Sequence, residues 1–267
     1  MRLIVTSLAA LLAGAVLATA QAQPDTGPGV PPGMAARLSA ERVGAVESGL
    51  YSVGDDRTFI LAPYGRDKYL LRFTGAGERF VLSVDRGSLG ARLLKYDTGT
   101  TALRISVWGG LTLYTQEFPG GMPATRQGDA PPAAVLAVSA PELQTAFNDE
   151  AGHLSYSQKV ALKFSADPAV LVADPETRGR AFDALTNAAV GIERFLAAVP
   201  SARPLLTRRI NSVKVAEGGK PTISITGQTL LVSFVPGEGH EGHASSLAIQ
   251  QELGKLLAPT TRDVATK

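Results

Sequence analysis

The sequence predicts an α+β protein, with an N-terminal antiparallel β-sandwich or partly open barrel followed by an α+β module. Two observations predict this fold class. Apolar and polar residues alternate from about residue 50 to 125, as they do along strands with one buried face, and turn residues recur roughly every 8 to 12 positions. The second half instead mixes helical and extended patterns, which indicates helices packed on a smaller sheet.

The first 22 residues have the pattern of a secretory signal peptide. Arg2 gives a short cationic start, and Leu3–Leu17 is an apolar run of about 15 residues, too short for the roughly 20 that cross a bilayer. The small residues of Ala20-Gln21-Ala22 predict cleavage before Gln23, with cleavage before Gln21 as the alternative. We therefore expect an exported protein, periplasmic or extracellular, with no membrane span after removal of the signal.

Composition excludes several classes of protein. The chain has no cysteine, so it has neither disulfides nor thiolate metal sites. It carries 26 Lys and Arg against 24 Asp and Glu, and its basic residues are spread singly apart from Arg208-Arg209. Nucleic-acid binders cluster their basic residues, so we expect no nucleic-acid partner. The 45% share of hydrophobic residues is typical of a folded globular protein.

Segments rich in proline, glycine and alanine mark the expected boundaries. The predicted parts are a signal peptide (1–22), a flexible tether (23–33), a short helix plus antiparallel β domain (34–126), a linker (127–138), an α+β domain (139–258) and a tail (259–267).

The strands of the β domain are predicted by a period of two. Tyr69, Leu71 and Phe73 share one face, while Lys68 and Arg72 share the other. Similar inward rows are Phe80, Leu82 and Val84, then Leu103, Ile105 and Val107, then Leu111 and Leu113. The glycine-containing segments between them suit tight turns, and six to eight short strands are expected.

The helices of the second half are predicted by caps and by apolar stripes. Ser139 and Glu142 have the spacing of a capping box, so a helix should begin near Pro141. Another should begin at Asp174-Pro175 and end before Pro200, because apolar residues recur there every three to four positions. The remaining expected elements are strands at 160–164, 212–216, 221–226 and 229–235, and helices at 203–208 and 245–257.

Glycine-rich segments of the β domain resemble a family of uncharacterised exported bacterial proteins, of the domain-of-unknown-function type. The segments are Tyr96-Asp97-Thr98-Gly99, Leu103-Arg104, Gly109–Thr115 and Gly120–Ala124, and the match lies mainly over residues 50–125. The resemblance implies export. The family brings no known activity, so no functional residue is carried over from it.

Asp97-Thr98-Gly99 matches the tripeptide that holds the catalytic aspartate of aspartic proteases, in which two carboxylates share one proton. Only one copy is present, so a homodimer would have to supply the second aspartate. Lys95-Tyr96 is also more polar than the buried strand that delivers such a loop. The favoured interpretation is a hairpin turn in which Asp97 caps the turn and Gly99 takes a positive φ.

The three histidines are candidate metal ligands. His240 and His243 flank Glu241 beside Gly237 and Gly239, and zinc or copper would need a third ligand, for which His153 is the candidate. A mobile polar loop is the favoured interpretation, so we expect no metal, no cofactor and little contribution of these histidines to folding.

The last helix contains Gln251-Glu252-Leu253-Gly254-Lys255, which is similar to the His-Glu-x-x-His helix of zinc peptidases with both histidines replaced. A decayed peptidase is therefore one interpretation of the C-terminal half. Simple amphipathicity is the other, because Leu253, Leu256 and Leu257 form an apolar stripe that leaves Gln251 and Lys255 in solvent.

Trp108, Tyr114 and Phe118 could form an aromatic platform for a sugar or peptide, although a core or rim position is favoured. With no convincing catalytic residue, the expected function is that of a non-catalytic envelope protein, an interaction or structural module with another envelope protein as candidate partner. The alternatives are the inactive peptidase or another hydrolase, and small-ligand binding in the β domain.

Overall fold

The computed structural model describes residues 46–55, 57–130 and 135–258. The predicted signal peptide, the predicted tether and most of the short helix expected at the start of the β domain lie outside this part of the chain. By internal contacts, the described residues all belong to one compact unit.

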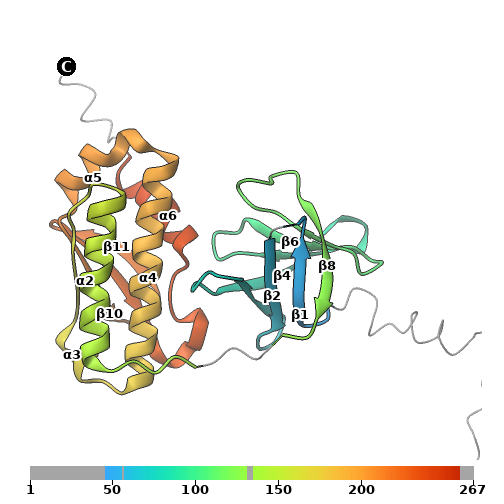
Figure 1. Cartoon of the computed structure of the whole chain (residues 1–267), viewed down its shortest axis with the longest axis horizontal. Helices are drawn as coiled ribbons and strands as arrows, with labels where there is room; N and C mark the ends of the chain where they lie inside the picture. The colour runs from blue at the N-terminus through green and yellow to red at the C-terminus, as the bar shows by residue number, and fades with distance from the viewer. Residues whose placement is uncertain (1–45, 56, 131–134, 259–267) are drawn as a thin grey trace, which may run out of the picture. The chain divides into compact units, whose positions relative to one another are not determined.

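The N-terminal part is a closed antiparallel barrel of eight strands (Figure 1). The strands are β1 (Gly49–Val53), β2 (Arg57–Pro63), β3 (Lys68–Phe73), β4 (Phe80–Arg86), β5 (Arg92–Lys95), β6 (Thr101–Ile105), β7 (Leu111–Leu113) and β8 (Met122–Gly128), with a 3₁₀ turn, η1 (Ser88–Gly90), before β5. The barrel closes because β1 pairs with β2 on one side and β8 on the other, so that Leu50 faces both Ile60 and Gly128. The predicted antiparallel fold is confirmed.

Alternating side chains fill the barrel as the period of two predicts. Phe59, Leu61, Leu71, Leu82 and Leu94 are fully buried in its interior. The rings of Tyr51 and Phe59 stack at 5.3 Å between centroids. Inward-facing apolar rows on every strand are what a small barrel needs, because its interior is filled by side chains.

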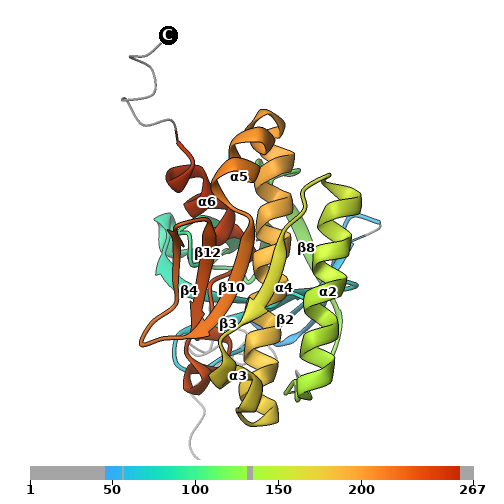
Figure 2. The ribbon, with the colours of Figure 1, turned by 90° about the vertical axis from the view of Figure 1, so that its left-hand side faces the viewer.

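The C-terminal part is a four-stranded sheet in the order β11-β12-β10-β9 (Figure 2). Its strands are β9 (Lys163–Ala166), β10 (Ser212–Glu217), β11 (Thr222–Thr226) and β12 (Thr229–Phe234). β10 runs parallel to both neighbours, and only β11 is antiparallel. The strand expected at 160–164 begins later, at Lys163, where pairing with Ser212 starts.

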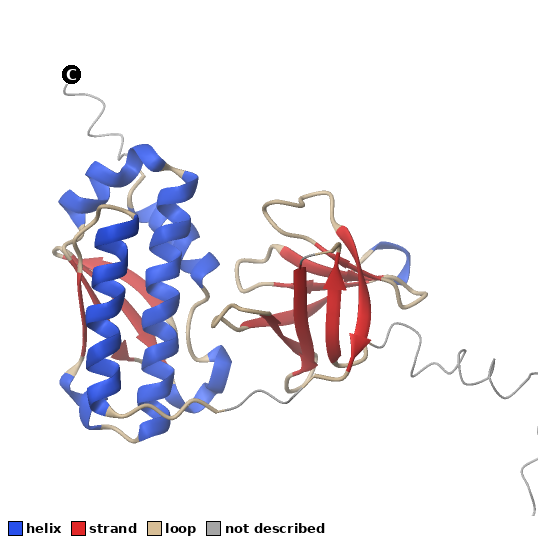
Figure 3. Ribbon diagram, in the orientation of Figure 1, coloured by secondary structure: helices blue, strands red, loops and turns tan. Residues whose placement is uncertain are grey.

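Helices cover this sheet (Figures 1 and 3). They are α2 (Ala140–Ser157), α3 (Pro168–Val172), α4 (Pro175–Ala198), α5 (Arg203–Arg209) and α6 (Ser246–Leu256), with 3₁₀ turns η2 (Pro200–Ala202) and η3 (Pro236–Glu241). The predicted capping box is present, because Glu142 N donates to Ser139 Oγ and Ser139 N donates to the Glu142 carboxylate. Asp174 caps α4 through the backbone amides of Glu176 and Thr177. α3 and η3 were not expected.

Close packing of α4 against α6 fixes the core of the C-terminal part. A methyl group at Gly191 would lie 2.6 Å from Ile249 Cγ2, so the two helices approach over a residue without a side chain. Within the described ranges, no helix combines the length and apolarity that crossing a bilayer requires.

Candidate functional site

One side of the candidate site consists of three polar side chains on α4. Arg180, Asp183 and Asn187 are spaced three and four residues apart, so they share one face of the helix. This face lies beside η3, away from the apolar stripe that enters the core. Arg180 is only 8% exposed and Asn187 only 3%. Buried polar groups need partners, and the segment from η3 to α6 supplies them.

Glycines shape the turn that brings the two histidines to α4. Gly239 has φ +59° and ψ −132°, and a methyl group there would lie 2.5 Å from Tyr64 Oη. Val235 N donates to the Gly242 carbonyl at 2.7 Å, which closes the neck of the turn. The glycines therefore permit close packing, whereas the sequence suggested that they make a mobile loop.

His243 is buried in the structure, with 8% of its surface exposed. Its Nδ1 lies 3.3 Å from Asn187 Nδ2, and Asn187 also donates to the Ala244 carbonyl at 3.0 Å. The expectation of a solvated polar loop is wrong for this residue. The reason is that tertiary packing against α4, not local sequence, decides its exposure.

Asp183, His240 and His243 each place one potential metal-ligand atom within 4.8 Å of the others. His243 Nε2 lies 3.8 Å from Asp183 Oδ2. His153, the third ligand considered from the sequence, is on α2, and its Nε2 lies 2.8 Å from a carboxylate oxygen of Glu193. Asp183 was not predicted as a ligand from the sequence. The polar residues at 180, 183 and 187, spaced three and four apart within a predicted helix, could have indicated it.

Burial and neighbouring charges keep the two imidazoles neutral. Burial, and then the positive charges of Arg180 and Arg79, lower the pKa of His240 to about 4. Burial also lowers the pKa of His243, against the opposing effect of the Asp183 carboxylate. Burial raises the pKa of Asp183. Arg180 Nη1 approaches His240 Nδ1 at 3.4 Å.

Five buried polar atoms around α4 have no hydrogen-bond partner among the described residues. These five, near the 180–187 stretch of the helix, are Arg79 Nε, Arg180 Nε, Asp183 Oδ2, Thr186 Oγ1 and His243 Nε2; two further atoms of this kind, Arg194 Nε and Arg203 Nε, lie farther along the chain. Buried polar atoms are normally satisfied, so such a cluster indicates a place where water or a ligand completes the bonding.

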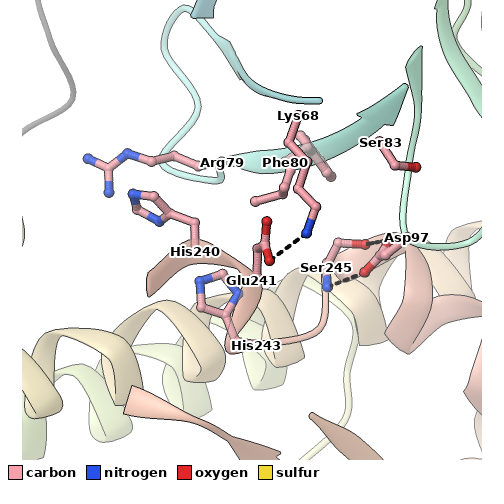
Figure 4. A pocket seen from close by; sticks show the side chains of 10 residues that line it. Lys68, Arg79, Phe80, Ser83, Asp97, His240, Glu241, His243 and Ser245 are labelled. Atoms are coloured by element: carbon pink, nitrogen blue, oxygen red, sulfur yellow. Dashed lines mark hydrogen bonds and ion pairs between the residues drawn. The ribbon is translucent and has the colours of Figure 1, made fainter. Parts of the chain in front are cut away.

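A pocket of about 200 Å³ opens beside this cluster (Figure 4). Its lining comes from β3, from β4 and the residue before it, from the turn between β5 and β6, and from η3 and the segment that joins it to α6. The lining residues are Lys68, Arg79, Phe80, Val81, Ser83, Asp97, His240, Glu241, His243 and Ser245. Lys68 forms an ion pair of 2.7 Å with Glu241, so these two charges neutralise each other. Tyr64 Oη accepts a hydrogen bond of 3.0 Å from His240 N.

The Asp97-Thr98-Gly99 turn is confirmed as a hairpin turn, with φ +81° at Gly99 and a hydrogen bond from Gly99 N to the Tyr96 carbonyl. The Asp97 side chain, however, does not cap its own turn. It accepts hydrogen bonds from Ser245 N at 2.9 Å and Ser245 Oγ at 2.7 Å, at the start of α6. That distant partner could not be read from the tripeptide.

The other candidates lie away from this cluster. Gln251 and Lys255 are exposed, and Lys255 pairs with Glu252 on the same helix at 2.9 Å. Trp108 lies in the turn between β6 and β7 and is 92% exposed, so a core position is wrong for it. Phe118 is partly exposed and lies beneath the Arg57 guanidinium, 5.5 Å from its ring centre.

A family model described as a domain of unknown function (DUF4908) matches residues 34–253. The chain therefore belongs to this family, and the family type suggested by the sequence is confirmed over a longer range than residues 50–125. Neither the curated proteins nor the solved structures include a match to this chain.

Proposed function

We propose that this protein is an exported, non-catalytic binding protein of the cell envelope that holds a small anionic ligand in the pocket of Figure 4. One observation carries the proposal. Arg79 lines the pocket, and its buried Nε has no partner among the described residues, whereas the carboxylates of Glu241 and Asp97 already have partners. Arg79 therefore has a buried guanidinium N–H that a ligand can bind.

The donors around Arg79 suit an oxyanion. A guanidinium binds phosphate or carboxylate through parallel N–H donors, and a neutral imidazole can add one more. His240 and His243 line the same pocket, and so does the Ser83 side chain. At about 200 Å³ the pocket is smaller than the roughly 300–1,000 Å³ of drug-sized ligand sites. A single phosphate or a short dicarboxylate has the right size.

Calorimetric titration of the mature chain with inorganic phosphate, and separately with malonate, tests this proposal. Arg79→Gln should weaken binding by about 10- to 100-fold, as expected for loss of a charged hydrogen-bond donor. Arg92→Gln is the matched control, because it removes the same charge from an exposed position on β5. Failure of both anions to bind, or equal binding by Arg79→Gln and the native chain, would contradict the proposal.

Contact with another envelope protein is the second candidate function. It is favoured by two exposed apolar side chains on neighbouring barrel loops, Leu89 at 89% and Trp108 at 92%. The loops are adjacent, since a methyl group at Gly90 would lie 3.1 Å from Val107 Cγ2. Trp108 is the single tryptophan, so its fluorescence reports on this surface. A blue shift on adding solubilised envelope proteins is expected, and an unchanged spectrum would count against this function.

A further inference from the structure

We propose that Asp183, His240 and His243 form a site for one divalent transition-metal ion, probed here as zinc. Two neutral imidazoles and one carboxylate are a common ligand set for such ions, and three protein ligands leave coordination positions for water or a bound anion. All three residues belong to the C-terminal part of the chain, two near η3 and one on α4.

The distances between the three ligand atoms suit a bound ion better than direct hydrogen bonds between the side chains. His243 Nε2 and Asp183 Oδ2 are 3.8 Å apart, which is too long for a hydrogen bond. Two ligand atoms on one tetrahedral zinc lie roughly 3.4 Å apart, given bonds of about 2.0–2.1 Å. The third ligand atom, from His240, lies within 4.8 Å of both. Side-chain rotations that move these atoms by about 1 Å would bring all three ligand atoms within bonding distance of one ion.

The bonding of His243 leaves one nitrogen available. Its Nδ1 lies 3.3 Å from Asn187 Nδ2. Its Nε2 is buried and has no hydrogen-bond partner among the described residues. The nearest carboxylate oxygen, Asp183 Oδ2, is 3.8 Å from Nε2 and is also buried without a partner among them. A cation bound between these two atoms would satisfy both of them.

The neighbours of His243 hold its ring in place, as the outer partners of metal-binding histidines do. Asn187 approaches Nδ1 and bonds the Ala244 carbonyl. Asn187 and Asp183 lie one helical turn apart on α4, so the same helix positions a ligand and the support of another ligand.

Two arginines place positive charge beside this site, and that charge affects how tightly a cation binds. Arg180 lies 3.4 Å from His240 Nδ1, and Arg79 acts on Asp183 and His240. A divalent cation beside two guanidiniums and one carboxylate is left with excess positive charge. The anion of the proposed function would offset that excess, so metal and anion should strengthen each other's binding. Only this coupling rests on the proposed function.

Titration of the chelator-treated mature chain with Zn²⁺ tests the site, and Co²⁺ absorption reports the coordination geometry. We expect one ion per chain, with affinity lowered by about 100-fold or more in Asp183→Asn and in His240→Gln. His153→Gln is the matched control and should bind as the native chain does. His240 is only partly buried, so His240→Gln should remain folded, which circular dichroism checks.

Binding below one equivalent, or native affinity in both Asp183→Asn and His240→Gln, would overturn the site. So would loss of binding in His153→Gln alone, because the ion would then lie on α2. Failure of the two proposals is distinguishable. In metal-free buffer, Asp183→Asn should bind phosphate at least as tightly as the native chain, since it removes a negative charge, although it no longer binds zinc. Arg79→Gln should lose phosphate and retain zinc in phosphate-free buffer.

Discussion

The Glu78 carboxylate accepts two hydrogen bonds from Ser246, one from the backbone N and one from Oγ, each 2.7 Å long. Glu78 precedes β4 of the barrel, and Ser246 is the first residue of α6. Glu78 is 8% exposed and Ser246 is fully buried. The first turn of a helix leaves backbone N–H donors without partners inside the helix. Glu78 accepts a hydrogen bond from one of these donors, the backbone N–H of Ser246.

Glu78→Ala should therefore destabilise the protein. The substitution leaves a buried N–H without an acceptor, at a cost of roughly 1–3 kcal/mol. Urea unfolding at neutral pH measures the change. Asp85→Ala is the control, because Asp85 is an exposed carboxylate on β4 and should cost far less. Equal losses in both variants would show that the Glu78–Ser246 pair contributes no stability.

Glu78→Gln should alter the pH dependence of stability. Burial raises the pKa of Glu78, with Asp97 acting in the same direction and Arg194 and Ser246 opposing it. A carboxyl whose pKa is raised on folding favours the folded state when protonated, and this contribution is lost as pH rises through the raised pKa. Glutamine does not titrate.

The stability of Glu78→Gln relative to the native protein should therefore increase as pH rises above about 4.3, the value of an unperturbed glutamate, and then level off. Unfolding curves of both proteins at a series of pH values measure this difference. A constant difference would show that Glu78 has the same pKa in the folded and unfolded states.

Gly191→Ala should destabilise the C-terminal part by about 1–3 kcal/mol, because the new methyl group overlaps Ile249 at the contact of α4 and α6. Gly152→Ala on α2 is the matched control. That position is exposed with open space around it, so alanine should stabilise by about 0.5–1 kcal/mol through helix propensity. Thermal unfolding compares the two, and the same sign for both would refute the packing argument.

Export predicts a shortened chain. Protein recovered from cells should begin at Gln23, or at Gln21 if the alternative site is cut. Sequencing of the N-terminus decides this, and recovery of Met1 would contradict export.

The predicted linker at 127–138 is tested by limited proteolysis. Cleavage there should yield two resistant fragments, because the barrel and the four-stranded sheet each have their own buried apolar cluster. A core that resists cleavage would argue against the division.

Local patterns predicted the elements well. Ser139 and Asp174 mark helix starts because capping is a matter of neighbouring residues. Barrel closure was not predictable, because Leu50 and Gly128 are distant in sequence and no local pattern encodes their pairing. The sequence therefore left a sandwich and a partly open barrel as alternatives.

The candidate site was predictable only in part. His240 and His243 were recognised as potential ligands from residue type and spacing. Asp183 was missed, and His153 was considered instead, because the third member of the cluster lies on a helix far upstream in the chain. The hydrogen-bond partner of Asp97 could not be predicted for the same reason, since only tertiary folding brings Ser245 to it.

The pairing of β1 with β8 also determines how this protein can associate with others. A closed ring of strands leaves no unpaired backbone edge, so a partner cannot extend the barrel by adding a strand and must instead recognise side chains or loops. Among the described strands, β9 and β11 are the two outer strands of the open sheet. Any assembly through strand addition would therefore have to begin in the C-terminal part.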